Sequence, residues 1–155
     1  MDPAMFNEAA KTLTYGVYVV TTRLGDSRNA LTAVWLTQVT KSPTEVAVSC
    51  GNDLHSTAMI RESGVFAVNV LAAGQKTLAY HFGRSSGREV DKFEGIPWEA
   101  GMTGSPILRG TAAFLDCRVT NSVETATHTI FIGEAVDGKF FPDLTPAVYR
   151  NGKIF

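Results

Sequence analysis

The stretch Asn29–Ile60, NALTAVWLTQVTKSPTEVAVSCGNDLHSTAMI, decides the fold. Its pattern predicts a strand, a turn, a second strand, and then a helix whose first residues are Ser56 and Thr57. The two strands are rich in threonine, serine and small apolar residues, and hydroxyls open the helix. Strands of this kind let a flat aromatic ring lie against their backbone, and a helix N-terminus binds an anion. The stretch therefore suits a flat aromatic ligand that carries a phosphate group.

Short strands and turns continue on both sides of this stretch. Segments rich in β-branched and aromatic residues are separated mostly by turns, and Asn151-Gly152 is typical of a two-residue hairpin. This order favours a mainly β fold, an antiparallel barrel with a few short helices outside it, over a parallel α/β sheet. The expected strands are Gly16–Thr22, Leu31–Thr40, Glu45–Cys50, Val65–Leu71, Thr111–Val123 and Thr127–Val136. The expected helices run from Pro3 to near Thr14, over Ser56–Ser63, and over Gln75–Phe82 with Gly83 as the stop, and Arg84–Gly104 is expected to be a long functional loop.

The composition is that of an ordinary globular protein, with 45% hydrophobic and 19% charged residues. Its length of 155 residues predicts a single domain over residues 1–155. The formal net charge of −1 gives no general attraction to nucleic acid or to a membrane surface, so neither is expected as a partner. The N-terminus has no signal-peptide pattern, and no apolar run approaches the length of a membrane span. We therefore expect a cytoplasmic protein.

Cysteine and histidine usage indicates neither a redox pair nor a metal centre. Cys50 and Cys117 belong to no CxxC pair and lie in apolar runs, which favours two reduced core thiols. His55, His81 and His128 lack the local spacing of zinc or iron ligands, so no metal is expected. The motifs GxGxxG after a strand, GxxxxGK[ST], GxSxG and HExxH are also missing from the sequence. A protein without an obvious nucleophile or metal fits cofactor chemistry, in which the ligand supplies the reactive atoms.

Three segments could bind the phosphate, and each also has an ordinary structural explanation. Ser56 and Thr57 could hold an anion or simply cap the helix. The segment Gly83–Arg88, GRSSGR, could pair its guanidinium groups with phosphate oxygens or form a solvated turn. Lys92 could act as a point charge on phosphate or be an exposed lysine, and Phe93 adds an aromatic ring beside it.

The ring and its reaction partner have candidates of the same kind. Trp35 could wall the ring, line a subunit interface, or pack in the barrel. Thr32 and Ala33 are small enough to let a flat ring approach the backbone. His128, at the start of an alternating strand, could orient a nicotinamide or donate to a carbonyl, although a surface or capping histidine is the more common outcome.

Taken in order along the chain, several segments resemble the flavin reductase-like proteins of the FMN-binding split-barrel superfamily. The match covers nearly the whole chain, so it is far more specific than any one segment. The resemblance implies an antiparallel split barrel that forms a homodimer, with FMN near the subunit interface. The matching segments are YGVYVVTT, NALTAVWLTQVTKSP, EVAVSC, HSTAMIRESGVFAVNVL, HFG…SGREVDKF, GSPILRGTAAFLDCRV and HTIFIGEAVDG.

The resemblance also implies positions for the flavin. The isoalloxazine ring would lie against residues 32–35 and 49–51, and the phosphate would meet the helix start, Lys92 and the loop at residues 84–86. His128 is the implied catalytic residue, near the nicotinamide side of the flavin. The implied cofactor-binding residues are Thr32, Ala33, Val34, Trp35, Ser49, Cys50, Gly51, Ser56, Thr57, Arg84, Ser86, Lys92 and Phe93.

The sequence departs from the family pattern at two places near the site. It has Ala30-Leu31-Thr32 where Gly-Met-Thr is common, and Ala126-Thr127-His128 where Gly-Asp-His is common. The second difference removes a carboxylate beside His128. No rubredoxin-type cysteine pairs are present, so the electron acceptor would be a free flavin or a separate protein.

The function implied by the resemblance is an NAD(P)H-dependent flavin reductase. NADH or NADPH would give a hydride to N5 of FMN, or of FAD, and the electrons would pass to a second acceptor. One alternative is a non-enzymatic FMN electron carrier, similar to flavoredoxin, that serves a redox partner. Another is a binding module of the same fold that prefers haem or a different cofactor, because a fold does not fix a function.

Overall fold

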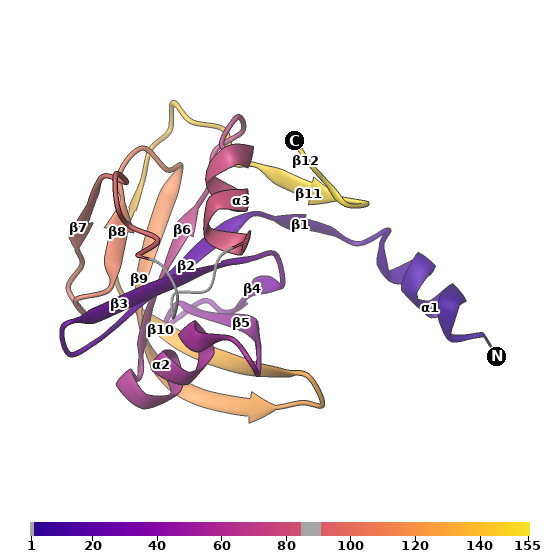
Figure 1. The fold of residues 1–155 in the computed structure, drawn as a ribbon, viewed down its shortest axis with the longest axis horizontal. Coiled ribbons are helices and arrows are strands. Elements are labelled where there is room, and N and C mark those ends of the chain that lie inside the picture. The colour runs from indigo at the N-terminus through magenta and orange to yellow at the C-terminus, as the bar shows by residue number, and fades with distance from the viewer. Residues whose placement is uncertain (1, 85–90) are drawn as a thin grey trace.

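Antiparallel strands make up most of the computed structural model, which describes residues 2–84 and 91–155 (Figure 1). The helices are α1 (Pro3–Ala10), α2 (His55–Ser63) and α3 (Lys76–Arg84). The main sheet contains β2 (Tyr18–Leu24), β3 (Ser27–Ala33), β4 (Leu36–Thr40), β5 (Glu45–Gly51), β6 (Val65–Val70), β9 (Ala113–Glu124) and β10 (His128–Phe140). Two smaller sheets contain β1 (Thr14–Gly16), β11 (Val148–Arg150) and β12 (Lys153–Ile154), and β7 (Trp98–Ala100) with β8 (Pro106–Leu108).

The main sheet curls into a barrel that is not closed. Its strands are hydrogen-bonded in the order β3-β2-β6-β9-β10-β5-β4, so β3 and β4 are the two edges. All the strand pairs of this sheet are antiparallel. The predicted fold, a mainly β antiparallel split barrel with a few short helices, is therefore confirmed.

The predicted strand Leu31–Thr40 is wrong as a single element, and the reason explains the split. Its first part belongs to β3, which pairs with β2, and its second part is β4, which pairs with β5 at the opposite edge. Val34 and Trp35, between the two strands, belong to neither of them. The chain thus passes from one edge of the barrel to the other at these two residues.

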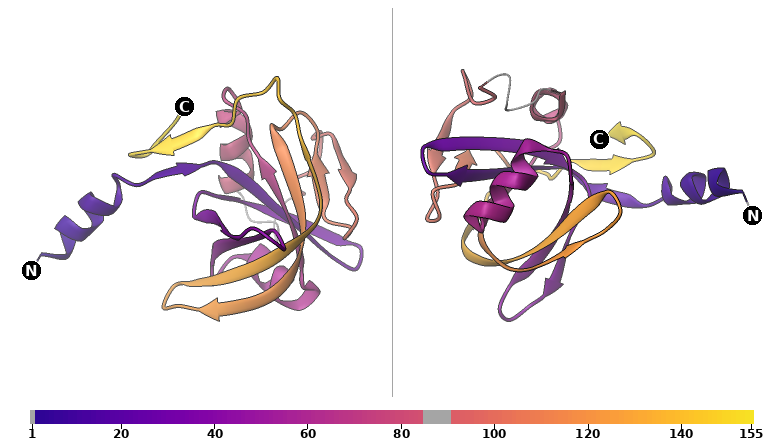
Figure 2. Two further views of the ribbon diagram at one scale, coloured as in Figure 1. Left: turned by 180° about the vertical axis from the view of Figure 1, so that it is seen from behind. Right: turned by 60° about the horizontal axis from the view of Figure 1, so that its bottom comes forward.

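Two apolar cores hold the elements together. One fills the barrel and includes Val20, Val48 and Phe66, with both cysteines among its other members. The second lies where α3 covers the sheet, and it includes Phe82 and Phe93. The alternating burial along β5 follows from the two-residue period of a strand with one face in the barrel. Helix α2 packs against β2 and β3 and crosses the barrel in the second view of Figure 2.

Several predicted boundaries are confirmed and others differ. Gly64 ends α2 in the left-handed conformation, with φ at 71°, and Asn151-Gly152 forms the turn between β11 and β12. Helix α1 is shorter than predicted, because it ends at Ala10. Helix α3 does not stop at Gly83, since this residue stays helical where the helix lies close to β3. The predicted loop Arg84–Gly104 contains β7, and its residues 85–90 lie outside the described part of the chain.

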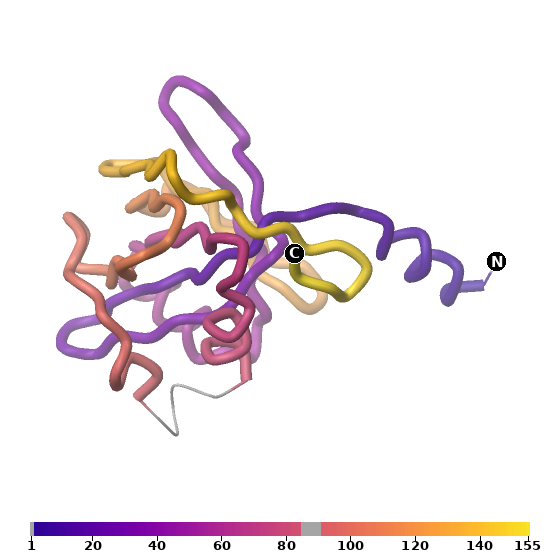
Figure 3. Tube along the Cα trace, turned by 90° about the horizontal axis from the view of Figure 1, so that it is seen from above, coloured from indigo at the N-terminus to yellow at the C-terminus, as the bar shows by residue number. Residues whose placement is uncertain are grey.

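The N-terminal and C-terminal elements extend from one side of the barrel. Strand β1 pairs with β11, and the turn then brings β12 back onto β11. Helix α1 stands away from the barrel beyond β1, as the views from the front, from behind and from above show (Figures 1, 2 and 3). Among the described residues, no helix is both long and apolar enough to cross a membrane.

Candidate functional site

The split between β3 and β4 opens into a pocket of about 410 Å³. The strand register builds this pocket, because His128 in β10 lies opposite Gly51 in β5 and the Ser49 amide donates to the Trp35 carbonyl over 2.9 Å. All the residues that were predicted to contact the ring line the pocket, together with His128. The lining residues are Leu31, Thr32, Ala33, Val34, Trp35, Ser49, Cys50, Gly51, Asp53, Leu54, Thr127 and His128.

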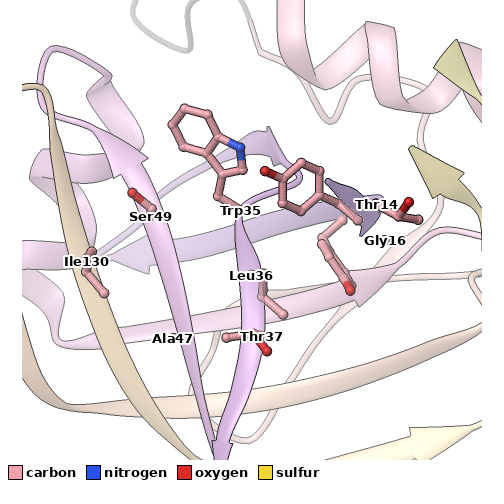
Figure 4. A pocket seen from close by; sticks show the side chains of 10 residues that line it. Thr14, Gly16, Trp35, Leu36, Thr37, Ala47, Ser49 and Ile130 are labelled. Carbon is pink, nitrogen blue, oxygen red and sulfur yellow. The ribbon is translucent and has the colours of Figure 1, made fainter. Parts of the chain in front are cut away.

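Trp35 forms a wall shared by this pocket and a larger neighbouring one. Its ring centroid is 4.9 Å from that of His128, with the two planes tilted by 52°. On its other side lies a cavity of about 670 Å³, where Trp35 projects from the link between β3 and β4 beside Ser49 on β5 (Figure 4). Trp35 is 49% exposed, so it can still contact a ligand or a partner protein.

The imidazole of His128 is held by the residue that departs from the family pattern. Thr127 Oγ1 lies 2.8 Å from His128 Nδ1, within hydrogen-bond distance. Thr127 stands at the sequence position of the aspartate in the common Gly-Asp-His pattern. Because Nδ1 is engaged, Nε2 is the ring nitrogen that can interact with a ligand.

The first turn of α2 lies next to the pocket and carries a buried hydroxyl without a hydrogen-bond partner among the described residues. Leu54 lines the pocket and is the N-cap residue of α2, but its side chain gives no capping hydrogen bond. Ser56 is only 2% exposed, and its Oγ has no hydrogen-bond partner among the residues that the structure describes. A buried hydroxyl without a partner is costly, and the first amides of a helix lack partners within the helix. This set of donors fits a phosphate group.

Thr57 is placed differently from its neighbour. Its Oγ1 donates to the Gly51 carbonyl over 2.6 Å, so the hydroxyl already has an acceptor in the protein. Thr32 is similar, since its Oγ1 donates to the Ala79 carbonyl over 2.5 Å. At both positions the backbone, rather than the hydroxyl proton, is what the protein can offer to a ligand.

Cys50 lines the pocket but is not suited to act as a nucleophile. The residue is buried, and burial raises the pKa of its thiol to about 12. The reactive thiolate is therefore scarce at neutral pH. Among the described residues, no group of three or more histidine, cysteine, aspartate or glutamate side chains is arranged to hold a metal ion.

The remaining predicted phosphate ligands do not line the pocket. Lys92 is buried, not exposed, and its Nζ donates to the carbonyls of Ala30 and Phe82 over 2.8 and 3.0 Å. Burial lowers the pKa of this lysine. Phe93 packs in the core between Phe82 and Trp98.

Arg84 and Ser86 complete the predicted phosphate ligands. Arg84 ends α3, with its guanidinium carbon 4.6 Å from the centre of the Tyr80 ring. Ser86 lies outside the described residues.

Sequence reasoning missed four residues of the pocket, Leu31, Asp53, Leu54 and Thr127. Asp53 and Leu54 lie between the predicted strand Glu45–Cys50 and the predicted helix Ser56–Ser63, so their place just before α2 is a usable signal for the pocket. Leu31 and Thr127 lie in the two segments that depart from the family pattern, so the resemblance carries no role for them.

Comparison with known proteins shows the family of the chain. The family model of the flavin reductase like domain matches residues 10–155. The chain therefore belongs to the flavin reductase-like family, within the FMN-binding split-barrel fold, and the resemblance seen in the sequence is confirmed.

Individual relatives are similar over most of this chain. It is 35% identical to a high molecular weight rubredoxin of Moorella thermoacetica over 94% of its length, but it spans only 64% of that protein. It is also 35% identical to the FMN reductase (NADH) RutF of Pseudomonas syringae, covering 85% of this chain and 74% of that one. The solved NADH:FAD oxidoreductase SgcE6 of Streptomyces globisporus superposes with a TM-score of 0.93 at 30% identity, covering all of this chain and 95% of that one. A structure of the same oxidoreductase in complex with NAD and FAD fragments gives a TM-score of 0.90 at 31% identity, covering 99% and 92% of the two chains.

Proposed function

We propose that this protein is an NAD(P)H-dependent flavin reductase that binds FMN. The observation that carries the proposal is the pocket at the split of the barrel, next to the unpartnered hydroxyl of Ser56 at the start of α2. A ring site and an anion site side by side match the two ends of FMN. The names of two similar proteins, an FMN reductase (NADH) and an NADH:FAD oxidoreductase, support the same activity and leave FAD as a second flavin.

The residues of the pocket would bind and orient, with no covalent role. When bound, the flavin would supply the redox chemistry by accepting a hydride at N5 and passing the electrons to a second acceptor. Strand backbone at Ala33 and Gly51 would hold the ring, and Ser56 with the first amides of α2 would hold the phosphate. His128 and Trp35 would position the nicotinamide of NADH or NADPH against the ring, because holding donor and acceptor in reaction geometry removes much of the barrier.

Three features of the surroundings also belong to the proposal. We infer that the protein works as a homodimer with the flavin near the subunit interface, which the exposed indole of Trp35 beside the pocket supports. A separate protein or a free flavin would be the electron acceptor. A cytoplasmic location agrees with the two buried cysteines, which are free thiols in the structure.

The visible spectrum of the purified protein tests the proposal. Spectra are taken as isolated, after addition of FMN, and then without oxygen after addition of NADH or NADPH. The expected result is a resolved flavin spectrum that bleaches promptly with at least one nicotinamide. Bound flavin that reacts with neither nicotinamide would indicate an electron carrier instead, and failure to bind FMN or FAD would overturn the proposal.

A further inference from the structure

The turn that leads into His128 lies where the strand pairing at the pocket ends. The pairing of β10 with β5 stops at His128, which lies opposite Gly51. Within the turn, the amide and the hydroxyl of Thr125 both donate to the His128 carbonyl, over 2.7 and 2.9 Å. These bonds close the turn, but they join it to nothing outside the hairpin of β9 and β10. The place of His128 at the pocket wall therefore depends on what holds the turn from outside.

Asn52, the first residue after β5, holds this turn at two points. Its amide donates to the Thr127 carbonyl over 2.9 Å, and its side-chain Nδ2 donates to the Thr125 carbonyl over 3.4 Å. Both carbonyls belong to the short segment just before β10. One residue thus ties the turn to the end of β5, whose last residue, Gly51, lines the pocket.

The direction of these hydrogen bonds follows from Arg61, in the last turn of α2. A guanidinium group only donates, and Arg61 Nη2 donates to Thr129 Oγ1 over 3.0 Å. Thr129 is only 3% exposed, and its single hydroxyl proton is directed to Asn52 Oδ1, 2.7 Å away. Because Oδ1 accepts from Thr129, the amide nitrogen of Asn52 is the atom that faces the Thr125 carbonyl.

We propose that Asn52 is a positioning residue of the candidate site, which holds His128 against Trp35 through the hydrogen-bond chain from Arg61 and Thr129. Asn52 does not line the pocket, although Gly51 before it and Asp53 after it do. Its effect on the reaction must then pass through the turn that it holds. The kinetic consequence rests on the proposed function, whereas the placement of the imidazole does not.

Asn52→Asp is the variant that tests this role. Aspartate has nearly the same shape and still accepts from Thr129, but its carboxylate cannot donate to the Thr125 carbonyl. We expect single-turnover reduction of bound FMN by NADH to slow about fivefold or more, because the turn no longer holds the imidazole in place. The dissociation constant for FMN should stay within about threefold. An undiminished rate in stopped-flow absorbance would overturn the proposal.

Asn121→Asp is the matched control on the same hairpin. Its side chain is exposed, and its Oδ1 accepts from the Ser122 amide over 2.8 Å, which a carboxylate can also do. The rate should therefore remain that of the natural protein. A loss equal to that of Asn52→Asp would mean that added charge near the turn, and not the lost donor, slows the reaction.

A double variant separates positioning from an independent effect. If Asn52 acts through His128, then Asn52→Asp combined with His128→Ala should be no slower than His128→Ala alone. Rate losses that multiply in the double variant would show that Asn52 acts on the reaction by another route, and the proposal would fail.

Nuclear magnetic resonance of the flavin-free protein reads the placement of the imidazole directly. The Trp35 and His128 rings, with centroids 4.9 Å apart, should give nuclear Overhauser cross-peaks in the natural chain, and Asn52→Asp should weaken them. Thr129→Val removes the hydroxyl of the chain while keeping its branched shape, so it should weaken them too. Thr129→Ser keeps the hydroxyl and should restore them. Equal loss in the serine and valine variants would contradict the hydrogen-bond chain.

The two kinds of measurement distinguish failure of this inference from failure of the proposed function. Circular dichroism first checks that each variant keeps the β signal of the natural chain, and the Thr129 pair provides the test if Asn52→Asp does not fold. Cross-peaks that weaken as expected in a protein that reduces no flavin would refute the proposed function alone. Cross-peaks of natural strength in Asn52→Asp and Thr129→Val, in a protein that reduces flavin, would refute the positioning role alone.

Discussion

At the scale of single residues, the two hydroxyls that open α2 have different partners and so should have different roles. Ser56 Oγ has no partner among the described residues, while Thr57 Oγ1 donates to the Gly51 carbonyl. We predict that Ser56→Ala weakens FMN binding about tenfold or more, because a hydrogen bond to a charged group contributes about 1.5–3 kcal/mol. The stability of the flavin-free protein should hardly change, since no internal hydrogen bond is lost. Fluorescence titration with FMN and thermal unfolding measure the two quantities.

Thr57→Val provides the matched comparison for that variant. It should lower the free energy of unfolding by about 0.5–1.5 kcal/mol, because one hydrogen bond to the Gly51 carbonyl is lost while that carbonyl keeps the Leu54 amide as a donor over 3.2 Å. If Ser56→Ala left FMN affinity unchanged, the phosphate would have to bind somewhere other than the first turn of α2.

His128 should affect the reaction more than the binding of the flavin. Its ring stands beside Trp35, and Thr127 holds Nδ1, so the imidazole has a fixed orientation at the pocket wall. We predict that His128→Ala slows single-turnover reduction of bound FMN by NADH about tenfold or more, through poorer orientation of the donor. The dissociation constant for FMN should stay within about threefold, since the ring contacts on the strand backbone are untouched. Anaerobic stopped-flow absorbance gives the rate, and an unchanged rate would remove His128 from the reaction site.

At the scale of elements, Lys92 joins α3 to β3 across the edge of the barrel. Its ammonium donates to the Ala30 carbonyl on β3 and to the Phe82 carbonyl in α3. We predict that Lys92→Met lowers the free energy of unfolding by about 2 kcal/mol or more, because two buried carbonyls lose a charged donor. Urea unfolding followed by circular dichroism measures the change.

Lys76 is the control for this variant, since it lies exposed at the start of the same helix. Lys76→Met should shift the free energy of unfolding by no more than about 0.5 kcal/mol. If Lys92→Met were equally mild but weakened FMN binding, the lysine would act on the phosphate rather than on the fold.

The comparison of sequence and structure is also clearest at the scale of elements. The residues predicted to contact the ring all line one pocket, because they lie on short strands whose pairing fixes their neighbours. The break at Val34 and Trp35 could not be predicted, since these residues continue the apolar alternation of a strand. The break arises because β3 pairs with β2 and β4 pairs with β5, at opposite edges of the sheet. These pairings are long-range contacts that the local sequence does not encode. The burial of Lys92 was missed for the same reason, because its carbonyl partners are brought there by α3 and β3.

At the scale of the whole molecule, the order of family segments predicted the split barrel correctly, whereas the position of α1 had no signal in the sequence. A short amphipathic segment has the same hydrophobic pattern whether it packs on its own chain or projects from it. Only the pairing of β1 with β11 shows that α1 is directed outward. The sequence therefore predicts that this helix forms and cannot predict what it packs against.

The two core thiols link the stability of the whole barrel to alkaline pH. Burial raises the pKa of Cys50 and Cys117 from 9.0 to about 12, and the Asp116 carboxylate adds to the effect at Cys117. Between these values the folded protein keeps thiol protons that the unfolded chain releases, so the free energy of unfolding falls as pH rises. Each thiol contributes up to about 1.4 kcal/mol per pH unit, with the full stabilisation present below pH 9.

We therefore predict that the free energy of unfolding of the flavin-free protein in urea falls steadily as the pH is raised above about 9, after a flat range between neutrality and that pH. Cys117→Ala should roughly halve the slope contributed by the two thiols, whatever its effect on stability at neutral pH, because one of the two linked protons is removed. Cys117 is the better position for the variant, since it lies in the barrel core and does not line the flavin pocket. An identical slope in the variant would mean that the Cys117 thiol titrates alike in the folded and unfolded chains, so that its burial does not protect the thiol from ionisation.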